Sequence, residues 1–189
     1  MNEPPWTIGE VNHWDRATFV ARLGGVFESS PWIVERVWSE RPFFDVADLH
    51  TRLRDAVHAA EATRQLALIR AHPDLVGQAA LAGTLTRESR GEQAAAGIDP
   101  GSLSADDIAQ FTALNHAYTA RFGFPFVICA RDNKKSEILA GLRTRVTNLI
   151  DEERRTALDE IAKIAWYRLT DAISESSVTG VQSGHRVGG

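Results

Sequence analysis

The stretch "SADDIAQFTALNHAYTAR", Ser104 to Arg121, decides the fold class, because its apolar residues recur at helical spacing. Ser104 and Asp107 resemble a capping box, in which each side chain bonds the backbone N–H of the other residue, with Asp in place of Glu. The apolar face consists of Ile108, Phe111, Leu114 and Tyr118. The stretch therefore predicts a capped α-helix that runs to about Arg121.

The same spacing recurs along most of the chain, and strand-like alternation is nearly absent. Ser30 before Pro31 predicts an N-cap followed by Pro at the first helical position, and Asp45 predicts another helix start. Further apolar stripes are Phe19, Leu23, Val26 and Phe27; Leu49, Leu53 and Val57; Ile138, Leu142, Val146 and Leu149; and Leu158, Ile161, Ile164, Ala165 and Leu169. We expect an all-α fold, a single compact domain of about eight or nine helices over residues 1–173.

Two segments depart from this pattern. In "RFGFPFVICAR", Arg121 to Arg131, aromatic and β-branched residues favour a strand. Pro125 argues against a long regular element, and a lone strand has no partner in so helical a chain. We therefore expect a buried segment that is irregular or begins a helix. Residues 174–189 are small and polar, which predicts a disordered tail.

Composition limits the class of partners. The 189 residues carry a formal net charge of -4 with acids and bases interspersed, so we expect no nucleic-acid partner. The N-terminal residues lack the basic and apolar regions of a signal peptide, and no apolar run approaches the ~20 residues that span a membrane. We expect a cytoplasmic protein that does not enter a membrane.

Cysteine and histidine usage bears on metal and redox chemistry. The single cysteine, Cys129, excludes an intramolecular disulfide. It lies in the apolar run "FVICA" and is expected to pack as a small residue rather than act as a nucleophile. The six histidines include no HExxH and no Cys/His pairing at zinc-ligand spacing, so we expect no metal site. The five tryptophans are expected to anchor the core.

The stretch "IRAHPDLVGQ", residues 69–78, places a histidine between two expected helices. The residue before a proline is pushed out of the α region, so the first helix should end near Ala71 or His72. Asp74 is placed to cap the next helix, which Gly83 would end. His72 then lies at a corner between two helices, either as a proton-transfer group or only as a residue that caps a helix end.

A third stretch, "LTRESRGEQAAAG", residues 85–97, predicts a helix capped by Thr86. Ser89, Glu92 and Gln93 stand at i, i+3 and i+4, which places a hydroxyl, a carboxylate and an amide on one helix face. Such a face suits a ligand rich in N–H and C=O groups. The alternative is a polar helix face that only contacts solvent.

Six blocks together resemble the OHCU decarboxylase family, the 2-oxo-4-hydroxy-4-carboxy-5-ureidoimidazoline decarboxylases of urate breakdown. They occur in the family's order and cover roughly the whole chain short of its two ends. The blocks are "FVARLGGVFESSPWIVERVW" (residues 19–38), "RPF" (41–43), "AHPDLVG" (71–77), "GTLTRESRGEQAAAG" (83–97), "LNHAYTARFGFPFVICAR" (114–131) and "KIAWYRL" (163–169).

The resemblance implies an all-helical fold and a set of site residues. It makes His72 the catalytic proton-transfer group, with Glu92 and Arg168 as further catalytic positions and Pro73 shaping the corner. The implied substrate-binding residues are Pro73, Ser89, the backbone at Arg90 and Gly91, Glu92, Gln93, and a pocket-lining segment of Phe126, Val127, Ile128, Cys129 and Ala130. Members of the family form dimers in at least some cases, so a homodimer is one expectation for this chain.

The implied substrate is a small ureidoimidazoline that bears a carboxylate and a hydroxyl on one ring carbon, and the implied product is S-allantoin. The neighbouring unsaturation of the ring can accept the electrons that carbon dioxide leaves behind, so no cofactor is expected. His72 would act as general base and acid, Arg168 would contact a planar carboxylate or carbonyl, and Glu92 would orient His72 or accept ureido N–H groups.

Two alternatives remain open. A J-domain-like co-chaperone also carries an HPD triplet between two helices, but Leu75 and Val76 follow the triplet here instead of a basic continuation. Stimulation of a partner chaperone's ATPase would distinguish that function. The second alternative is a ligand-binding relative that keeps the fold without catalysis.

Overall fold

The computed structural model describes residues 5–77, 80 and 82–174. Within this part the chain forms nine α-helices, short 3-10 turns and one pair of two-residue strands, which confirms the all-α prediction. The elements are β1 (Trp6–Thr7), α1 (Ile8–His13), α2 (Arg16–Leu23), η1 (Gly24–Val26), α3 (Pro31–Val37), η2 (Trp38–Glu40), α4 (Val46–His58), α5 (Ala62–Arg70), α7 (Arg87–Ala95), η3 (Pro100–Ser102), α8 (Ala105–Phe122), η4 (Ala130–Asp132), α9 (Lys135–Arg145), α10 (Ile150–Ala172) and β2 (Ile173–Ser174).

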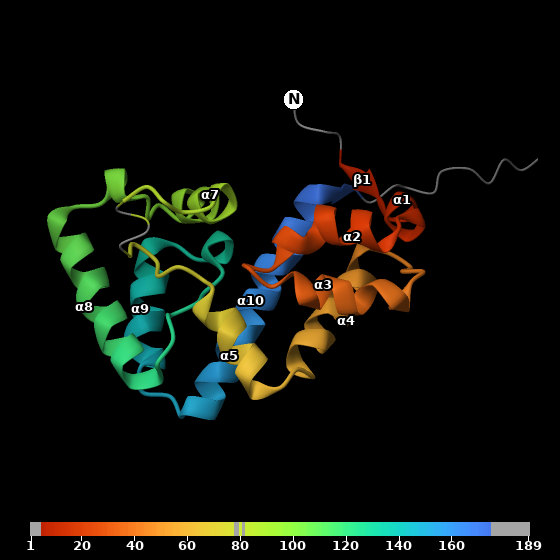
Figure 1. Ribbon diagram of the computed structural model, residues 1–189. Coiled ribbons are helices and arrows are strands. Elements are labelled where there is room, and N and C mark those ends of the chain that lie inside the picture. Colours follow the sequence, from red (N-terminus) through yellow and green to blue (C-terminus); the bar gives the residue numbers. More distant parts are fainter. Residues whose placement is uncertain (1–4, 78–79, 81, 175–189) are drawn as a thin grey trace, which may run out of the picture.

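The longest helix, α10, organises the fold (Figure 1). Its 23 residues span roughly 35 Å at the usual rise of about 1.5 Å per residue. Helices α1 to α4 lie on one side of α10, and α7, α8 and α9 lie on the other (Figure 1). Helices α4 and α5 pack directly against α10. Side chains of α10 can therefore contact both groups of helices.

The buried apolar side chains form one core, and aromatic rings make up much of it. Phe19, Phe27 and Tyr118 are among the fully buried side chains. All five tryptophans pack against this core, as predicted, but they do so from its edge, because each is only partly buried. An indole is large and carries a polar N–H, which suits a position between the core and water.

The helix-start signals are mostly confirmed. Ser104 and Asp107 form the expected capping box at the start of α8, and Asp45 accepts a hydrogen bond from the backbone N–H of Asp48 at the start of α4. Helix α3 begins at Pro31 as predicted, but the side chain of Ser30 makes no capping hydrogen bond. Pro31 lacks an N–H and sets its own φ, so this helix start depends less on a side-chain cap.

Helix α8 ends at Gly123, whose φ of +74° is the left-handed conformation that glycine adopts most easily. Residues 124–129 then run without regular structure to η4, and Phe126 and Cys129 are each 1% exposed. Of the two predicted alternatives for this buried segment, irregular backbone or a helix start, residues 124–129 take the irregular one. This segment brings backbone and apolar side chains next to α10 and α7.

The chain end differs from the sequence prediction by one residue. Ser174, which we assigned to the tail, lies in β2 and pairs with Thr7 of β1 in a parallel register. The pattern gave no sign of a strand this short. The predicted disordered tail otherwise falls on residues 175–189, outside the described residues. No helix in the described part of the chain is long and apolar enough to span a bilayer.

Candidate active site

Helix α5 ends at Arg70, with Ala71 at the C-cap, and places His72 at the corner that the sequence predicts. The imidazole is only 7% exposed, and its Nδ1 lies 2.9 Å from the carbonyl oxygen of Leu68 one turn back. A carbonyl can only accept, so Nδ1 carries the proton in this hydrogen bond. The lone pair of a neutral ring then belongs to Nε2, which is the atom left for a ligand.

Burial determines the protonation state of His72. Removal from water lowers the pKa of His72 to about 4, although the Leu68 carbonyl and the carboxylate of Glu28 act in the opposite direction. The ring is therefore neutral at neutral pH, so Nε2 can accept a proton. An anionic ligand in the same pocket would favour the imidazolium form and raise this pKa.

Helix α7 presents the predicted polar face. Thr86 accepts a hydrogen bond from the backbone N–H of Ser89 and caps the helix. The Ser89 hydroxyl donates to Oε1 of Glu28 at 2.8 Å. The side-chain oxygen of Gln93 accepts the N–H of Val76 at 3.2 Å. Val76 has a φ of +54°, which is strained for a β-branched residue, so Gln93 holds a strained loop next to the His72 corner.

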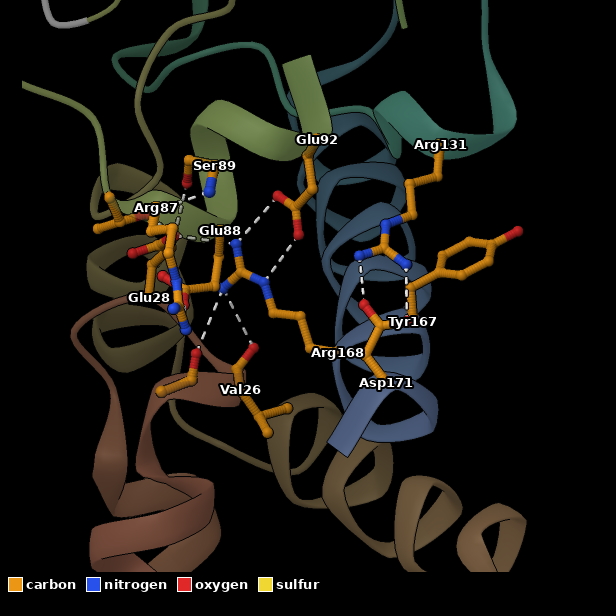
Figure 2. Close-up of polar contacts among 12 residues, drawn as sticks. Val26, Glu28, Arg87, Glu88, Ser89, Glu92, Arg131, Tyr167, Arg168 and Asp171 are labelled. Carbon is orange, nitrogen blue, oxygen red and sulfur yellow. Dashed lines mark hydrogen bonds and ion pairs between the residues drawn. The ribbon is translucent and has the colours of Figure 1, made fainter. Parts of the chain in front are cut away.

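Arg168, on the last turns of α10, joins α7 to the segment after η1 (Figure 2). Its Nε and Nη2 donate to the two carboxylate oxygens of Glu92 at 2.9 and 3.0 Å, in a bidentate pair. Nη2 also lies 3.0 Å from Oε1 of Glu28. Nη1 has only long contacts, at 3.4 Å, to the carbonyl oxygens of Gly25 and Val26.

The charges in this cluster stabilise one another. Burial raises the pKa of Glu28, but the hydrogen bond from Ser89 and the charge of Arg168 outweigh it and hold the pKa below its ordinary value. Burial lowers the pKa of Arg168, and the Glu92 and Glu28 carboxylates reverse this and raise it. One guanidinium is thus held between two carboxylates. The sequence analysis missed Glu28, because a single glutamate in "FESS" carries no local signal of its distant partner.

These side chains surround a pocket of about 380 Å³, including the part open to solvent, which we call the His72 pocket. Polar groups converge on one side, and apolar residues of α10 and of the irregular segment close the other. The lining residues are His72, Pro73, Leu75, Ser89, Glu92, Gln93, Phe126, Val127, Ile128, Ala130, Ile164 and Arg168. Leu75 and Ile164 are additions that the sequence analysis did not name.

Three of the expected site residues lie outside that lining. The Arg90 guanidinium is exposed and donates to the carbonyl oxygens of Gly83 and Leu85. Gly91 lines a neighbouring hollow. Cys129 is buried behind the pocket wall, where burial raises the pKa of its thiol to about 11 and disfavours a thiolate.

Asp74 was expected to cap a helix directly after the His72 corner, but no helix begins at residues 75–77, and residues 78, 79 and 81 of the expected helix lie outside the described part. Within the described residues, Leu75 and Val76 form a turn. Oδ1 of Asp74 is buried without a hydrogen-bond partner, and burial raises the pKa of this carboxyl. Gly83 does adopt the left-handed conformation, with φ of +71°.

Across residues 5–77, 80 and 82–174, no three His, Cys, Asp or Glu side chains converge as they would around a metal ion. The donor set of the His72 pocket fits an acid–base site. It combines a neutral imidazole with the Glu92 carboxylate, which the Arg168 guanidinium already neutralises in part.

A neutral buried histidine beside an arginine–carboxylate cluster is typical of an enzyme that transfers protons to and from a small polar substrate. Comparison with known proteins narrows this class. The family model for OHCU decarboxylase matches residues 12–170, and the chain belongs to that family. The match spans far more than the HPD triplet, so the co-chaperone alternative is not favoured.

Relatives of similar length carry the same family name. A 2-oxo-4-hydroxy-4-carboxy-5-ureidoimidazoline decarboxylase of Amia calva is 43% identical over 164 residues, which cover 87% of this chain and 93% of the relative. One of Haloferax volcanii is 41% identical over 168 residues, which cover 89% of this chain and 96% of the relative. The similarity therefore extends over nearly the full length of these proteins.

Solved structures share the fold. The crystal structure of (S)-allantoin synthase superposes with a TM-score of 0.72 at 27% identity and covers 92% of this chain, which spans 56% of that longer protein. An OHCU decarboxylase crystallised in the presence of (S)-allantoin gives a TM-score of 0.62 at 22% identity, and the superposition covers 84% of this chain and 97% of that one. The second likeness concerns the fold alone.

Proposed function

We propose that this chain catalyses the decarboxylation of 2-oxo-4-hydroxy-4-carboxy-5-ureidoimidazoline to (S)-allantoin in urate breakdown. The observation that carries the proposal is the His72 pocket, where a buried neutral imidazole lies with the Arg168–Glu92 pair in a chain of the OHCU decarboxylase family. The relatives from Amia calva and Haloferax volcanii bear the name of this activity.

The reaction requires one bond to break and one proton to be placed. The bond between the ring carbon and its carboxylate breaks, carbon dioxide leaves, and the electron pair passes into the neighbouring unsaturation of the ring. A proton then adds to one face of the resulting carbanion or enol. The ring accepts the electrons itself, so this scheme requires no cofactor.

His72 is the proposed proton-transfer group. Its Nε2 draws a proton from the substrate hydroxyl or an imide-like N–H as carbon dioxide departs, and then returns a proton to the carbanion or enol. The Nδ1–H hydrogen bond to Leu68 fixes the plane of the ring, so delivery comes from one direction. A fixed direction explains a single product enantiomer.

The polar face supplies orientation. Arg168 presents a planar fork of N–H donors to a carboxylate or carbonyl of the substrate. Glu92 accepts ureido N–H groups or orients His72, and Ser89 and Gln93 offer donors and acceptors to the same amide-rich ligand. Glu28 acts on the substrate only through these groups, because it holds both Ser89 and Arg168.

The remaining implied residues act as walls. Pro73 and the apolar stretch Phe126 to Ala130 limit water beside the reacting carbon, which strengthens electrostatic interactions there. Cys129 contributes by filling the space behind this wall. The backbone at Arg90 and Gly91 is proposed to contact the ligand, and Gly91 lines a hollow next to the His72 pocket.

The setting of the protein is part of the proposal. We place it in the cytoplasm, acting on a small molecule without a nucleic-acid or membrane partner, and a homodimer is the assembly that the family resemblance favours. Sedimentation would test the dimer independently of activity.

The activity is tested by the handedness of the product. Urate oxidase and hydroxyisourate hydrolase would generate fresh substrate, and circular dichroism would follow its conversion in the presence of the protein. Rapid appearance of (S)-allantoin is the expected result. Racemic allantoin at the spontaneous rate would contradict the proposal and would favour a ligand-binding relative without catalysis.

A further inference from the structure

A second hollow lies against the Arg168–Glu92 pair. It has a volume of about 1180 Å³, including the part open to solvent, and we call it the outer pocket. Glu92 and Arg168 line both this pocket and the His72 pocket, so the ion pair forms the wall between them. Figure 2 shows this pair together with Arg131 and Asp171, which line the outer pocket beside Tyr167.

A substrate needs a path to the His72 pocket, because its polar groups are buried. His72, Ser89, Gln93 and Arg168 are each less than a tenth exposed. Three neighbouring hollows share a wall with this pocket: the outer pocket, a hollow beyond His72 and Pro73, and a hollow beyond Gln93. The charged residues that line each hollow indicate which of the three is the entrance.

The outer pocket is the most cationic of the three. Four arginines line it against three carboxylates, whereas each of the other two hollows has one arginine and one aspartate. The arginines are Arg22, Arg87, Arg131 and Arg168, and the carboxylates are Glu88, Glu92 and Asp171. A cationic hollow raises the local concentration of an anion, and the proposed substrate carries a carboxylate.

Two of these arginines are available to an anion. The Arg22 guanidinium lies 5.0 Å from the ring centre of Trp6 and 4.9 Å from that of Trp14, so two indole rings position it. The Arg87 side chain is 90% exposed and has only a 3.4 Å contact to the adjacent Glu88. Arg131 is not available to an anion in the same way, because its guanidinium pairs with both carboxylate oxygens of Asp171.

Glycines keep this hollow open. A Cβ built on Gly25 or on Gly91 would meet no atom within 4 Å, and both residues line the outer pocket. Neither has a positive φ, so neither turn geometry nor close packing explains the missing side chain. Glycine inside helix α7 weakens the helix relative to alanine, which makes Gly91 costly unless open space is useful there.

We propose that the outer pocket is the entrance for the anionic substrate. Arg22 and Arg87 bind the substrate carboxylate first. This carboxylate then replaces Glu92 as the partner of Arg168, and the substrate passes into the His72 pocket. The exchange conserves the charge around Arg168, because one carboxylate leaves as another arrives. This inference rests on the proposed function for the identity of the anion. The position and charge of the entrance do not depend on it.

A cysteine probe tests the entrance. The native thiol of Cys129 is 1% exposed, so a thiol introduced by Gly25→Cys is the accessible one in the folded chain. Methanethiosulfonate reagents of similar size, one anionic and one cationic, would be compared on this variant. Ala109→Cys, on an exposed position of α8, serves as the reference, and Thr119→Cys places a thiol in the hollow beyond His72.

The expected result has two parts. Relative to Ala109→Cys, the thiol at position 25 should react at least threefold faster with the anionic than with the cationic reagent. A bulky adduct at position 25 should lower kcat/KM at least tenfold from its value before modification, while adducts at positions 109 and 119 change it less than twofold. Inhibition by the adduct at position 119 instead would overturn the proposal, as would equal reagent preference at positions 25 and 109.

A charge variant provides a matched second test. Arg22→Gln should lower kcat/KM at least threefold at low ionic strength, and the loss should shrink in high salt. Arg64→Gln is the control, because the Arg64 guanidinium also stacks on an indole, 5.1 Å from the ring centre of Trp32, but does not line the outer pocket. Equal losses of kcat/KM in Arg22→Gln and Arg64→Gln would overturn the proposal that the outer pocket is the entrance. A wild-type protein that produces no (S)-allantoin would overturn the proposed function, while the reagent preference would still decide the charge of the entrance.

Discussion

Helix α10 carries a buried ionic cluster near each end, and the two differ in what surrounds them. Near its start, Glu153 is completely buried, and near its end Arg168 is 8% exposed. Both clusters combine arginine with carboxylate, and both join α10 to distant segments. The Arg168 cluster lines two pockets, the His72 pocket and the outer pocket.

The Glu153 cluster is saturated by the protein itself. Arg145 donates to Oε1 of Glu153 from Nε at 2.9 Å and from Nη2 at 2.5 Å, and Asn148 donates to Oε2 at 2.7 Å. The Tyr118 hydroxyl donates to the same carboxylate, and burial together with that carboxylate raises the pKa of Tyr118. Since these partners occupy the carboxylate, the cluster connects helices but has no free capacity for a ligand.

The Arg168 cluster keeps unused capacity. Its Nη1 has only 3.4 Å contacts, and Glu92 holds the guanidinium at the wall between two pockets. A buried charge on a rigid helix contributes to stability where groups of the protein itself satisfy all of its hydrogen bonds. It serves chemistry where one partner can be exchanged for a ligand.

The largest expected effect on stability is at Glu153. Glu153→Leu removes the shared acceptor of Arg145, Asn148 and Tyr118 and leaves a buried guanidinium unpaired. The free energy of unfolding in urea should fall by about 3–5 kcal/mol. Asp151→Ala is the control on the same helix, because the Asp151 carboxylate is 77% exposed in its pair with Arg154, and the pair should contribute less than about 1 kcal/mol. Equal losses from both variants would contradict the contrast between saturated and exposed pairs.

The next effect is the dependence of stability on pH at His72. The ordinary pKa of 6.5 applies to the unfolded chain, and burial lowers the pKa to about 4 in the folded protein. Between these values the unfolded chain binds a proton that the folded protein does not, so stability falls as the pH falls. The loss at pH 4 should reach roughly 3 kcal/mol relative to pH 7.

His72→Asn isolates this contribution from those of the carboxylates. The variant should lose less stability than the wild type when urea unfolding is compared at pH 7 and pH 4.5. Parallel loss in the two proteins would mean that His72 is not neutralised by burial.

Within the two buried clusters, the smallest stability effect is expected at Glu92. Glu92→Gln keeps the shape but removes the charge, and Glu28 still neutralises Arg168, so the cost should be about 1–2 kcal/mol. Activity should nevertheless fall at least tenfold, because the group at the pocket wall has changed. Stopped-flow rates per folded protein and urea unfolding, measured on the same preparations, check both parts. If Glu92→Gln lost activity only in proportion to its loss of folded protein, the Arg168 cluster would serve stability alone, as the Glu153 cluster does, and the contrast between the two clusters would be contradicted.

The helices were predictable because their signals are local. The stripe through Tyr118 and the box formed by Ser104 and Asp107 depend on neighbours within a few residues. The His72 corner and the polar face of α7 were also predictable from local signals, but the catalytic role of His72 and the place of Arg168 in the site followed only from the resemblance of whole blocks to a family. Glu28 was not predictable, because its partners Ser89 and Arg168 lie 61 and 140 residues away along the chain. The strand pairing of Thr7 with Ser174 was not predictable either, because it joins the two ends of the described chain.

The central claim is that His72 transfers the proton, and the rate of His72→Ala with freshly generated substrate tests it most directly. General acid–base catalysis contributes ~10²- to 10⁴-fold, so kcat/KM should fall at least about 100-fold while the far-ultraviolet spectrum of the folded protein is retained. The residual product should be racemic. A loss of less than roughly tenfold, with (S)-allantoin still formed, would contradict the account and leave His72 as a residue that only shapes the helix corner.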